Sequence, residues 1–145
     1  MPNKNTKIIN PYTDTTCFGV MPEIRNPHFP SGEIFLRHGK HFGPNRGFGV
    51  QHIWTEHNRE IKELGYETEE DVARYIADIL QEGARIYYEG YSLRNERVTI
   101  VKSFLGWVLA EHRIDGENND FYSVITAYKG KVPHGQEIGK LPAVK

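Results

Sequence analysis

Four runs of β-branched and aromatic residues in the second half of the chain restrict its possible folds most strongly. Short clusters of Asn, Gly and Asp separate the runs, which are Ala84–Tyr91, Arg97–Phe104, Trp107–Ile114 and Phe121–Tyr128. Such residues favour strands, and Asp-Gly or Asn-rich connections are typical of turns. Because connections this short join antiparallel neighbours, the sequence predicts a four-stranded antiparallel meander.

Two amphipathic helices are expected before these strands. Apolar residues recur at helical spacing over Val50–Leu64, and Gly65 supplies a stop. Thr68 followed by three acids is typical of a second helix start, and the apolar spacing continues to Leu80. The predicted fold class is therefore α+β, with two N-terminal helices packed on one face of a four-stranded antiparallel sheet.

The two ends of the chain show neither helical nor alternating periodicity. Residues 1–33 contain five prolines, and residues 130–145 contain two more. We therefore expect an irregular N-terminal arm or linker over residues 1–33, one folded domain over residues 34–129 and an irregular tail over residues 130–145.

Composition excludes several classes of protein. The 145 residues are 38% hydrophobic and 26% charged, which suits one soluble domain. Neither a membrane-spanning run nor the apolar core of a signal peptide is evident. The single Cys17 excludes an intrachain disulfide and a cysteine-built zinc site, so we expect a cytoplasmic site of action. The net charge of −1 means that any binding site for a polyanion must be a local patch.

One local patch precedes the first predicted helix. From Ile34 to Thr55 the chain carries three formal positive charges, no acid and four glycines, and residues 37–64 hold four of the seven histidines. A cationic loop that leads into a helix N-terminus is a plausible phosphate site. The predicted substrate-binding residues are Arg37, Lys40, His41 and Arg46. The same glycines are equally consistent with a loop that simply turns.

Two histidines on the first helix are candidate catalytic residues. His57 occupies the position on the apolar stripe where a leucine is expected, and His52 points toward the basic loop. His57 taken alone is equally consistent with a core histidine that is hydrogen-bonded to the backbone. Five residues separate the pair, or about 140° at roughly 100° per residue. Either His52 therefore lies on a bent N-terminal turn, or His41 is the partner of His57.

The spacing of the histidines argues against metal and nucleophile chemistry. Zinc proteases place two histidines four residues apart with a glutamate after the first, which the pair His52 and His57 does not do. His38 and His41 could chelate, but no third ligand is evident, so no metal and no cofactor are expected. Neither a G-x-S-x-G elbow nor a phosphate-cradling nucleotide motif is present.

Acid–base cleavage of RNA suits the available groups better. The 2′-hydroxyl must lose a proton, the 5′-oxygen must gain one, and a cation should stabilise the charged phosphorane. Two histidines supply the proton transfers without a metal. Thr126 and Tyr128 project side by side from the last predicted strand, where they would orient the base or phosphate, although both are also ordinary strand residues.

The order of these features resembles the barnase–EndoU–colicin–RelE group of ribonucleases. The resemblance covers residues 34–129: the segment GFGVQHIWTEH, then a second helix, then a four-stranded meander that ends in Thr126-Ala-Tyr128. Within the group, the EndoU-like and phage-associated branches are the most similar, and they also occur as toxin domains of contact-dependent growth inhibition systems. The resemblance implies that residues 34–129 are a nuclease domain.

The resemblance also implies a mechanism and a set of residues. The mechanism is metal-independent RNA cleavage that leaves a 2′,3′-cyclic phosphate, often on tRNA. Carried over to this chain, His52 and His57 are the acid–base pair, and Thr126 with Tyr128 position the substrate. Lys102 is the expected cation on a middle strand, with Arg97 and Arg113 as rivals.

Two further expectations concern partners and an alternative function. A toxin domain implies delivery as part of a larger secreted protein and a neutralising immunity protein, which we expect to be acidic and to cover Arg37–His57. The non-enzymatic alternative is an RNA-binding or phage structural module that uses the same basic loop.

Overall fold

The structure is a computed structural model that describes residues 3–92, 95–102, 105–130 and 135–143. Its elements follow one another in this order: β1 (Val20–Met21), β2 (Gly32–Phe35), β3 (Lys40–Gly43), β4 (Arg46–Phe48), α1 (Gly49–Glu63), a 3-10 turn (Glu69–Asp71), α2 (Val72–Ile79), β5 (Arg85–Ser92), β6 (Asn95–Lys102), β7 (Gly106–Ile114), β8 (Asp120–Tyr128) and β9 (Glu137–Lys140).

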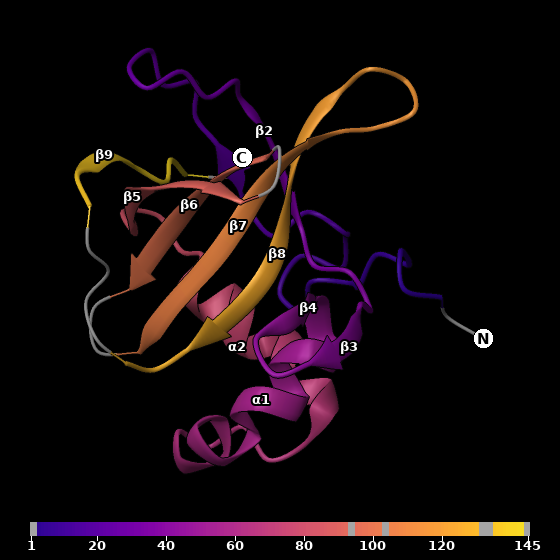
Figure 1. Ribbon diagram of the computed structural model, residues 1–145. Helices are drawn as coiled ribbons and strands as arrows, with labels where there is room; N and C mark the ends of the chain where they lie inside the picture. The colour runs from indigo at the N-terminus through magenta and orange to yellow at the C-terminus, as the bar shows by residue number, and fades with distance from the viewer. Residues whose placement is uncertain (1–2, 93–94, 103–104, 131–134, 144–145) are drawn as a thin grey trace.

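Most of the molecule is a curled, mixed β-sheet. Seven strands form it in the order β1-β2-β8-β7-β6-β5-β9, and β3 with β4 forms a separate two-stranded sheet beside α1 (Figure 1). Strand β2 runs parallel to β8, whereas the other neighbours are antiparallel. The curled sheet has the form of a half-barrel.

The expected α+β fold, with a four-stranded antiparallel sheet and irregular arms, is therefore wrong. The predicted meander is present as β5 to β8, but β1 and β2 extend it at one edge and β9 at the other. Strands β1 and β9 lie in the segments expected to be irregular, and β2 begins in one and continues into the predicted domain. Strands of two to four residues are too short to show alternation, and the pairing of β2 with β8 depends on residues distant in the sequence. The predicted strand end at Phe104 lies outside the described residues.

The hydrophobic core lies between one face of the sheet and the two helices. On α1, Ile53 and Ile61 are fully buried, so the predicted apolar stripe is confirmed there. On α2, Ile76 and Ile79 are fully buried as well, and Thr68 with Asp71 forms the capping box at the start of this segment. The other face of β6, β7 and β8 is left for the site described next.

Candidate functional site

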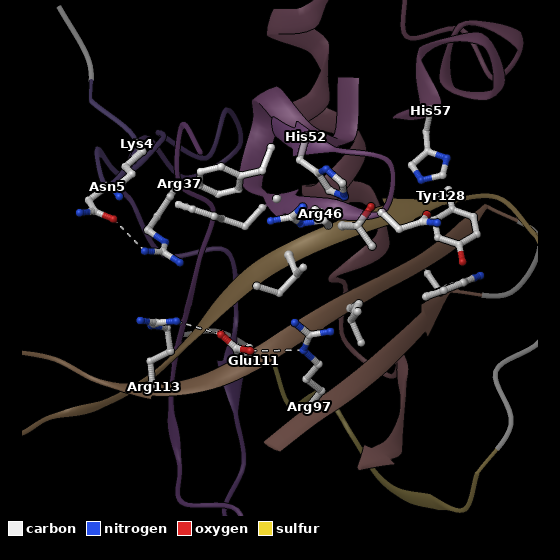
Figure 2. A pocket seen from close by; sticks show the side chains of 18 residues that line it. Lys4, Asn5, Arg37, Arg46, His52, His57, Arg97, Glu111, Arg113 and Tyr128 are labelled. Atoms are coloured by element: carbon white, nitrogen blue, oxygen red, sulfur yellow. Dashed lines mark hydrogen bonds and ion pairs between the residues drawn. The ribbon is translucent and has the colours of Figure 1, made fainter. Parts of the chain in front are cut away.

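A cleft of about 750 Å³ lies on the face of the sheet opposite the core. Residues of the N-terminal segment, the β3–β4 hairpin, α1 and strands β6 to β8 form its walls (Figure 2). Five permanent cations and one acid line it: Lys4, Arg37, Arg46, Arg97, Arg113 and Glu111. The whole chain has a net charge of −1, so the cleft concentrates positive charge that the molecule as a whole does not carry.

A β-bulge at Ile125 turns the end of β8 toward the cleft. Leu109 pairs with Thr126, whereas its neighbour Ala110 pairs with Val124, so Ile125 is an extra residue. An extra residue reverses the faces of all that follow it. Strict alternation along β8 would place Tyr122, Val124, Thr126 and Tyr128 on one face. In the structure the first two are buried in the core and the last two line the cleft.

His57 reaches the cleft because α1 is kinked at this residue. Its backbone angles, φ −130° and ψ 15°, are not helical. The side chain of Asn58 donates from Nδ2 to the Trp54 carbonyl at 2.8 Å, and this carbonyl is the acceptor that the backbone N–H of Asn58 would use in a regular helix. The His57 ring stacks on Tyr128 with centroids 4.2 Å apart, and Trp107 packs on Tyr128 at the same distance.

His52 projects from the first turn of α1 and contacts His41 of β3. The residue is only 4% exposed, and its Nδ1 lies 3.1 Å from Nδ1 of His41. Burial lowers the pKa of His52 and so favours its neutral form. Gly47 provides the space, since a Cβ there would lie 2.9 Å from the His52 Nδ1. With Nδ1 directed at His41, Nε2 is the nitrogen of His52 that is left for a ligand in the cleft.

Three arginines and one carboxylate form the opposite wall and the adjoining end of the cleft. Glu111 is 5% exposed and pairs with Arg97 at 3.3 Å and with Arg113 at 2.9 Å. The Arg37 guanidinium donates hydrogen bonds to two uncharged acceptors, Ser123 Oγ at 2.8 Å and Asn5 Oδ1 at 2.9 Å. Burial is the main reason why the pKa of Arg37 is lowered to about 10, and the positive charge of Arg113 lowers it further. Arg37 therefore remains a cation at neutral pH. Figure 2 shows Arg97, Glu111 and Arg113 across the cleft from His52 and His57, with Arg37 on the side of His52.

Three buried polar atoms of cleft-lining residues have no hydrogen-bond partner within the described part of the chain. They are Nδ1 of His57, Oγ1 of Thr126 and Nε1 of Trp107. A buried donor without a partner costs about 1–3 kcal/mol. These atoms belong to side chains that line the cleft, so the unpaired groups lie at the edge of the space that a ligand would enter.

The N-terminus of α1 differs from the anion site expected there. The backbone N–H groups of Val50 and Gln51 donate to the carbonyls of Arg37 and His38, both at 3.0 Å. Gly39 and Gly49, both at positive φ, allow these backbones to cross, since a Cβ on Gly39 would lie 1.9 Å from the Phe48 carbonyl oxygen. The glycines thus permit a close crossing, and the two N–H groups are already used within the protein.

Six of the nine predicted site residues line the cleft: Arg37, Arg46, His52, His57, Thr126 and Tyr128. The other three do not. His41 supports His52, and the Nζ of Lys40 lies over the Phe42 ring at 5.4 Å. Lys102 follows Arg97 on β6 by an odd number of residues, so the alternation of side chains along a strand places it on the opposite face of the sheet, away from the cleft. The cleft instead contains the two rivals of Lys102, Arg97 and Arg113.

Several lining residues carry no motif and were not predicted. Glu111, Trp107 and Asn5 are the clearest examples. Alternation along β7 could have placed Trp107, Glu111 and Arg113 on one face, but the sequence does not show which face covers the core. Asn5 lies in a segment whose position follows only from tertiary contacts.

The structure offers one cluster with metal-ligand chemistry among its described residues, His41, His52 and Glu56. His38 lines a separate cavity with Gln51 and Arg74 and is not part of this cluster. In the described ranges no helix is long and apolar enough to cross a membrane.

Comparison with protein-family models and with curated proteins found no match.

Proposed function

We propose that the chain is a metal-independent endoribonuclease that leaves a 2′,3′-cyclic phosphate. The observation that carries this proposal is the placement of two imidazoles opposite a group of arginines in one cleft. Histidines are suited to proton transfer near neutral pH, and arginines bind phosphate through paired N–H groups. A cleft floor with aromatic side chains suits a nucleobase as well as its phosphate.

His52 is the proposed general base. Nδ1 of His52 contacts Nδ1 of His41, and if it donates its proton there, Nε2 carries a free lone pair. Nε2 takes the proton of the ribose 2′-hydroxyl while the 2′-oxygen forms a bond to phosphorus. Burial, which favours the neutral ring, supports this role.

His57 is the proposed general acid. The bond between phosphorus and the 5′-oxygen breaks as His57 gives its proton to that oxygen. Stacking on Tyr128 and the kink at His57 fix the direction of the ring. The two proton transfers leave one product with a cyclic phosphate and the other with a 5′-hydroxyl.

Arg37, Arg97 and Arg113 take the role of the phosphate-binding cation. Glu111 holds Arg97 and Arg113 in place, and one carboxylate leaves the group of three guanidinium ions with net positive charge. Such fixed cations stabilise charge that develops on the phosphorane oxygens. Thr126 lines the same cleft, and its hydroxyl would donate to the phosphate or the base after rotation of the side chain.

The test is incubation of the purified protein with total tRNA in EDTA, read on a denaturing gel. We expect discrete fragments from the wild type and a loss of about 10²–10⁴-fold in rate for His57→Ala. His112→Ala is the matched control, because His112 pairs with Asp120 at 2.8 Å and does not line the cleft. Intact RNA with a folded wild-type protein would contradict the proposal and favour the RNA-binding module.

A toxin role accounts for the same features at the level of the cell. We propose that such a domain would act on cytoplasmic RNA after delivery by a larger protein, and that an acidic immunity protein would cover residues 37–57. The cationic lining of the cleft supports an acidic inhibitor.

A further inference from the structure

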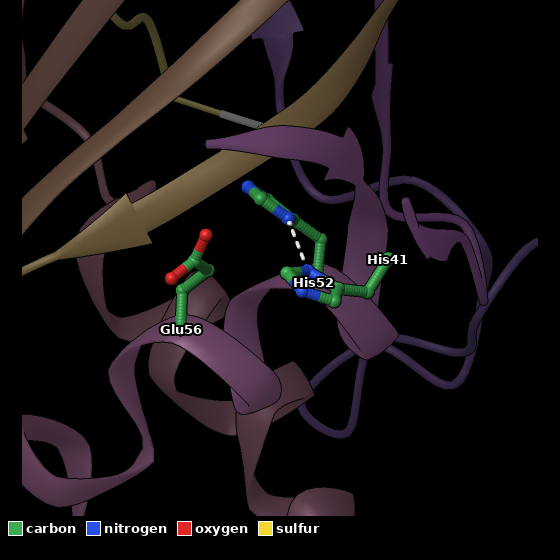
Figure 3. Close-up of side chains that lie close together, drawn as sticks. All are labelled: His41, His52 and Glu56. Carbon is green, nitrogen blue, oxygen red and sulfur yellow. Dashed lines mark hydrogen bonds between the residues drawn. The ribbon is translucent and has the colours of Figure 1, made fainter. Parts of the chain in front are cut away.

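His41, His52 and Glu56 bring three metal-binding atoms together from two elements. His41 comes from β3, and His52 and Glu56 lie one helical turn apart on α1 (Figure 3). The ligand atoms of all three lie within 4.8 Å of one another. His52 is buried and the other two side chains are partly exposed, so an ion can reach the cluster from solvent.

The two imidazoles already have nearly the separation that one zinc ion requires. Zinc binds histidine nitrogens at about 2.0–2.1 Å in tetrahedral geometry, which places two such nitrogens roughly 3.3 Å apart. The Nδ1 atoms of His41 and His52 lie 3.1 Å apart, with rings inclined by 21°. The Glu56 carboxylate must also approach the ion, and a Glu side chain can do so by rotation about its own bonds.

A hydrogen bond to the backbone positions Glu56 beside the two histidines. Oε1 of Glu56 accepts the backbone N–H of Asn45 at 2.6 Å. One oxygen thus fixes the side chain, and the other remains for a metal. Two neutral imidazoles and one carboxylate leave a fourth position for water.

We propose that His41, His52 and Glu56 bind one zinc ion, and that zinc at this site inhibits RNA cleavage. The site stands on the geometry of the three side chains, whereas the inhibition rests on the ribonuclease function proposed above. A zinc ion on Nδ1 of His52 requires the proton of the neutral ring to be on Nε2. Nε2 then has no lone pair for the 2′-hydroxyl proton, and the proposed base is lost.

Zinc binding is tested first without RNA. ZnCl₂ is titrated calorimetrically into protein that has been stripped with EDTA and dialysed. We expect one ion per chain, with affinity lowered at least tenfold in His41→Ala and in Glu56→Gln, since each loses one of three ligands. Glu56→Gln keeps an oxygen for the Asn45 N–H. His112→Ala removes a histidine of a different carboxylate pair, so it should bind zinc as the wild type does.

A second measurement uses the wild type alone, so that a folding defect in a variant cannot decide the outcome. Two-bond ¹H–¹⁵N spectra of the histidine rings should show zinc-induced changes at Nδ1 of His41 and His52 and none at His112. Absence of binding, or equal binding by the wild type and Glu56→Gln, overturns the site. Shifts confined to other histidines overturn it as well.

Inhibition is then measured in the cleavage assay. Zinc should stop RNA cleavage by the wild type, EDTA should restore it, and Glu56→Gln should need at least tenfold more zinc. Undiminished cleavage by the zinc-loaded wild type overturns the inhibitory role. If EDTA-treated wild type cleaves no RNA but zinc binds as described, the ribonuclease proposal fails and the zinc site is supported.

Discussion

The cleft is positively charged because its arginine residues outnumber its acidic residues. Arg97 and Arg113 are both paired with the single carboxylate of Glu111, and Arg37 is hydrogen-bonded to neutral groups. Like charges held this close raise the energy of the empty cleft, and an anion lowers it. The charges of these side chains therefore favour an anionic ligand such as a phosphate.

Arg97 and Lys102 provide a direct comparison between two cations on the same strand. We expect Arg97→Ala to lower kcat/KM for RNA cleavage by about 10²–10³-fold, the usual loss for one group that stabilises transition-state charge. Lys102→Ala should change it less than about threefold, because Lys102 lies on the other face of β6. Steady-state kinetics on one RNA oligonucleotide in EDTA measures both. A larger loss for Lys102→Ala would contradict the assignment.

At the scale of elements, the backbone just before the β3–β4 hairpin crosses the backbone at the start of α1. This crossing holds Arg37 beside the helix that carries His52. Arg37 and His38 cap the first turn of α1 through their carbonyls, so the loop that carries Arg37 cannot move independently of His52. The crossing requires glycine at two points, Gly39 and Gly49, each with positive φ. The two elements therefore form a single rigid side of the cleft.

Gly39→Ala tests this crossing. The substitution should lower the free energy of unfolding by at least about 2 kcal/mol, because a Cβ meets the Phe48 carbonyl and an alanine is strained at φ 81°. Gly116→Ala is the control, since a Cβ there meets nothing within 4 Å. Urea denaturation followed by circular dichroism gives both values. Equal stability of the two variants would show that the backbones are not in contact.

Helices and long strands could be predicted from the sequence because their signals are local. The apolar stripe of α1 and the four runs that become β5 to β8 each repeat over many residues. The bulge at Ile125 leaves no such signal, since it is defined by pairing with Leu109 and Ala110. The kink at His57 is accompanied by a side-chain hydrogen bond from Asn58 to the Trp54 carbonyl, which periodicity also leaves unmarked. The position of the catalytic candidates therefore follows from these two local irregularities, which periodicity does not reveal.

At the scale of the whole molecule, the sheet extends beyond the part that a meander predicts. The short strands β1, β2 and β9 carry no repeating pattern of their own, and both helices and the strands β5 to β7 separate β2 from its partner β8 in the sequence. Tyr122 of β8 donates to the Pro30 carbonyl at 2.7 Å and anchors the N-terminal segment to the core. This segment in turn brings Lys4, Asn5 and Arg37 to the cleft.

The contrast between a net charge of −1 and a cationic cleft predicts a modest dependence of RNA binding on salt. For single strands the logarithm of affinity falls with the logarithm of salt concentration by about 0.7 per phosphate neutralised. Three arginines predict a slope of about −2 for a non-cleavable 2′-O-methyl RNA, and Arg97→Ala should reduce its magnitude by about 0.7. Fluorescence anisotropy at several salt concentrations measures this. A slope near zero would contradict phosphate binding in the cleft.

The central claim is best tested by the chemistry of the cleaved ends. A short RNA is incubated with the protein in EDTA, and the products are identified by mass spectrometry. The account predicts a 2′,3′-cyclic phosphate on one product, a 5′-hydroxyl on the other, and no cleavage when the 2′-hydroxyl at the cleaved position is replaced by hydrogen. Cleavage of that deoxy substrate, ends with a 3′-hydroxyl and 5′-phosphate, or loss of all cleavage in EDTA would contradict it.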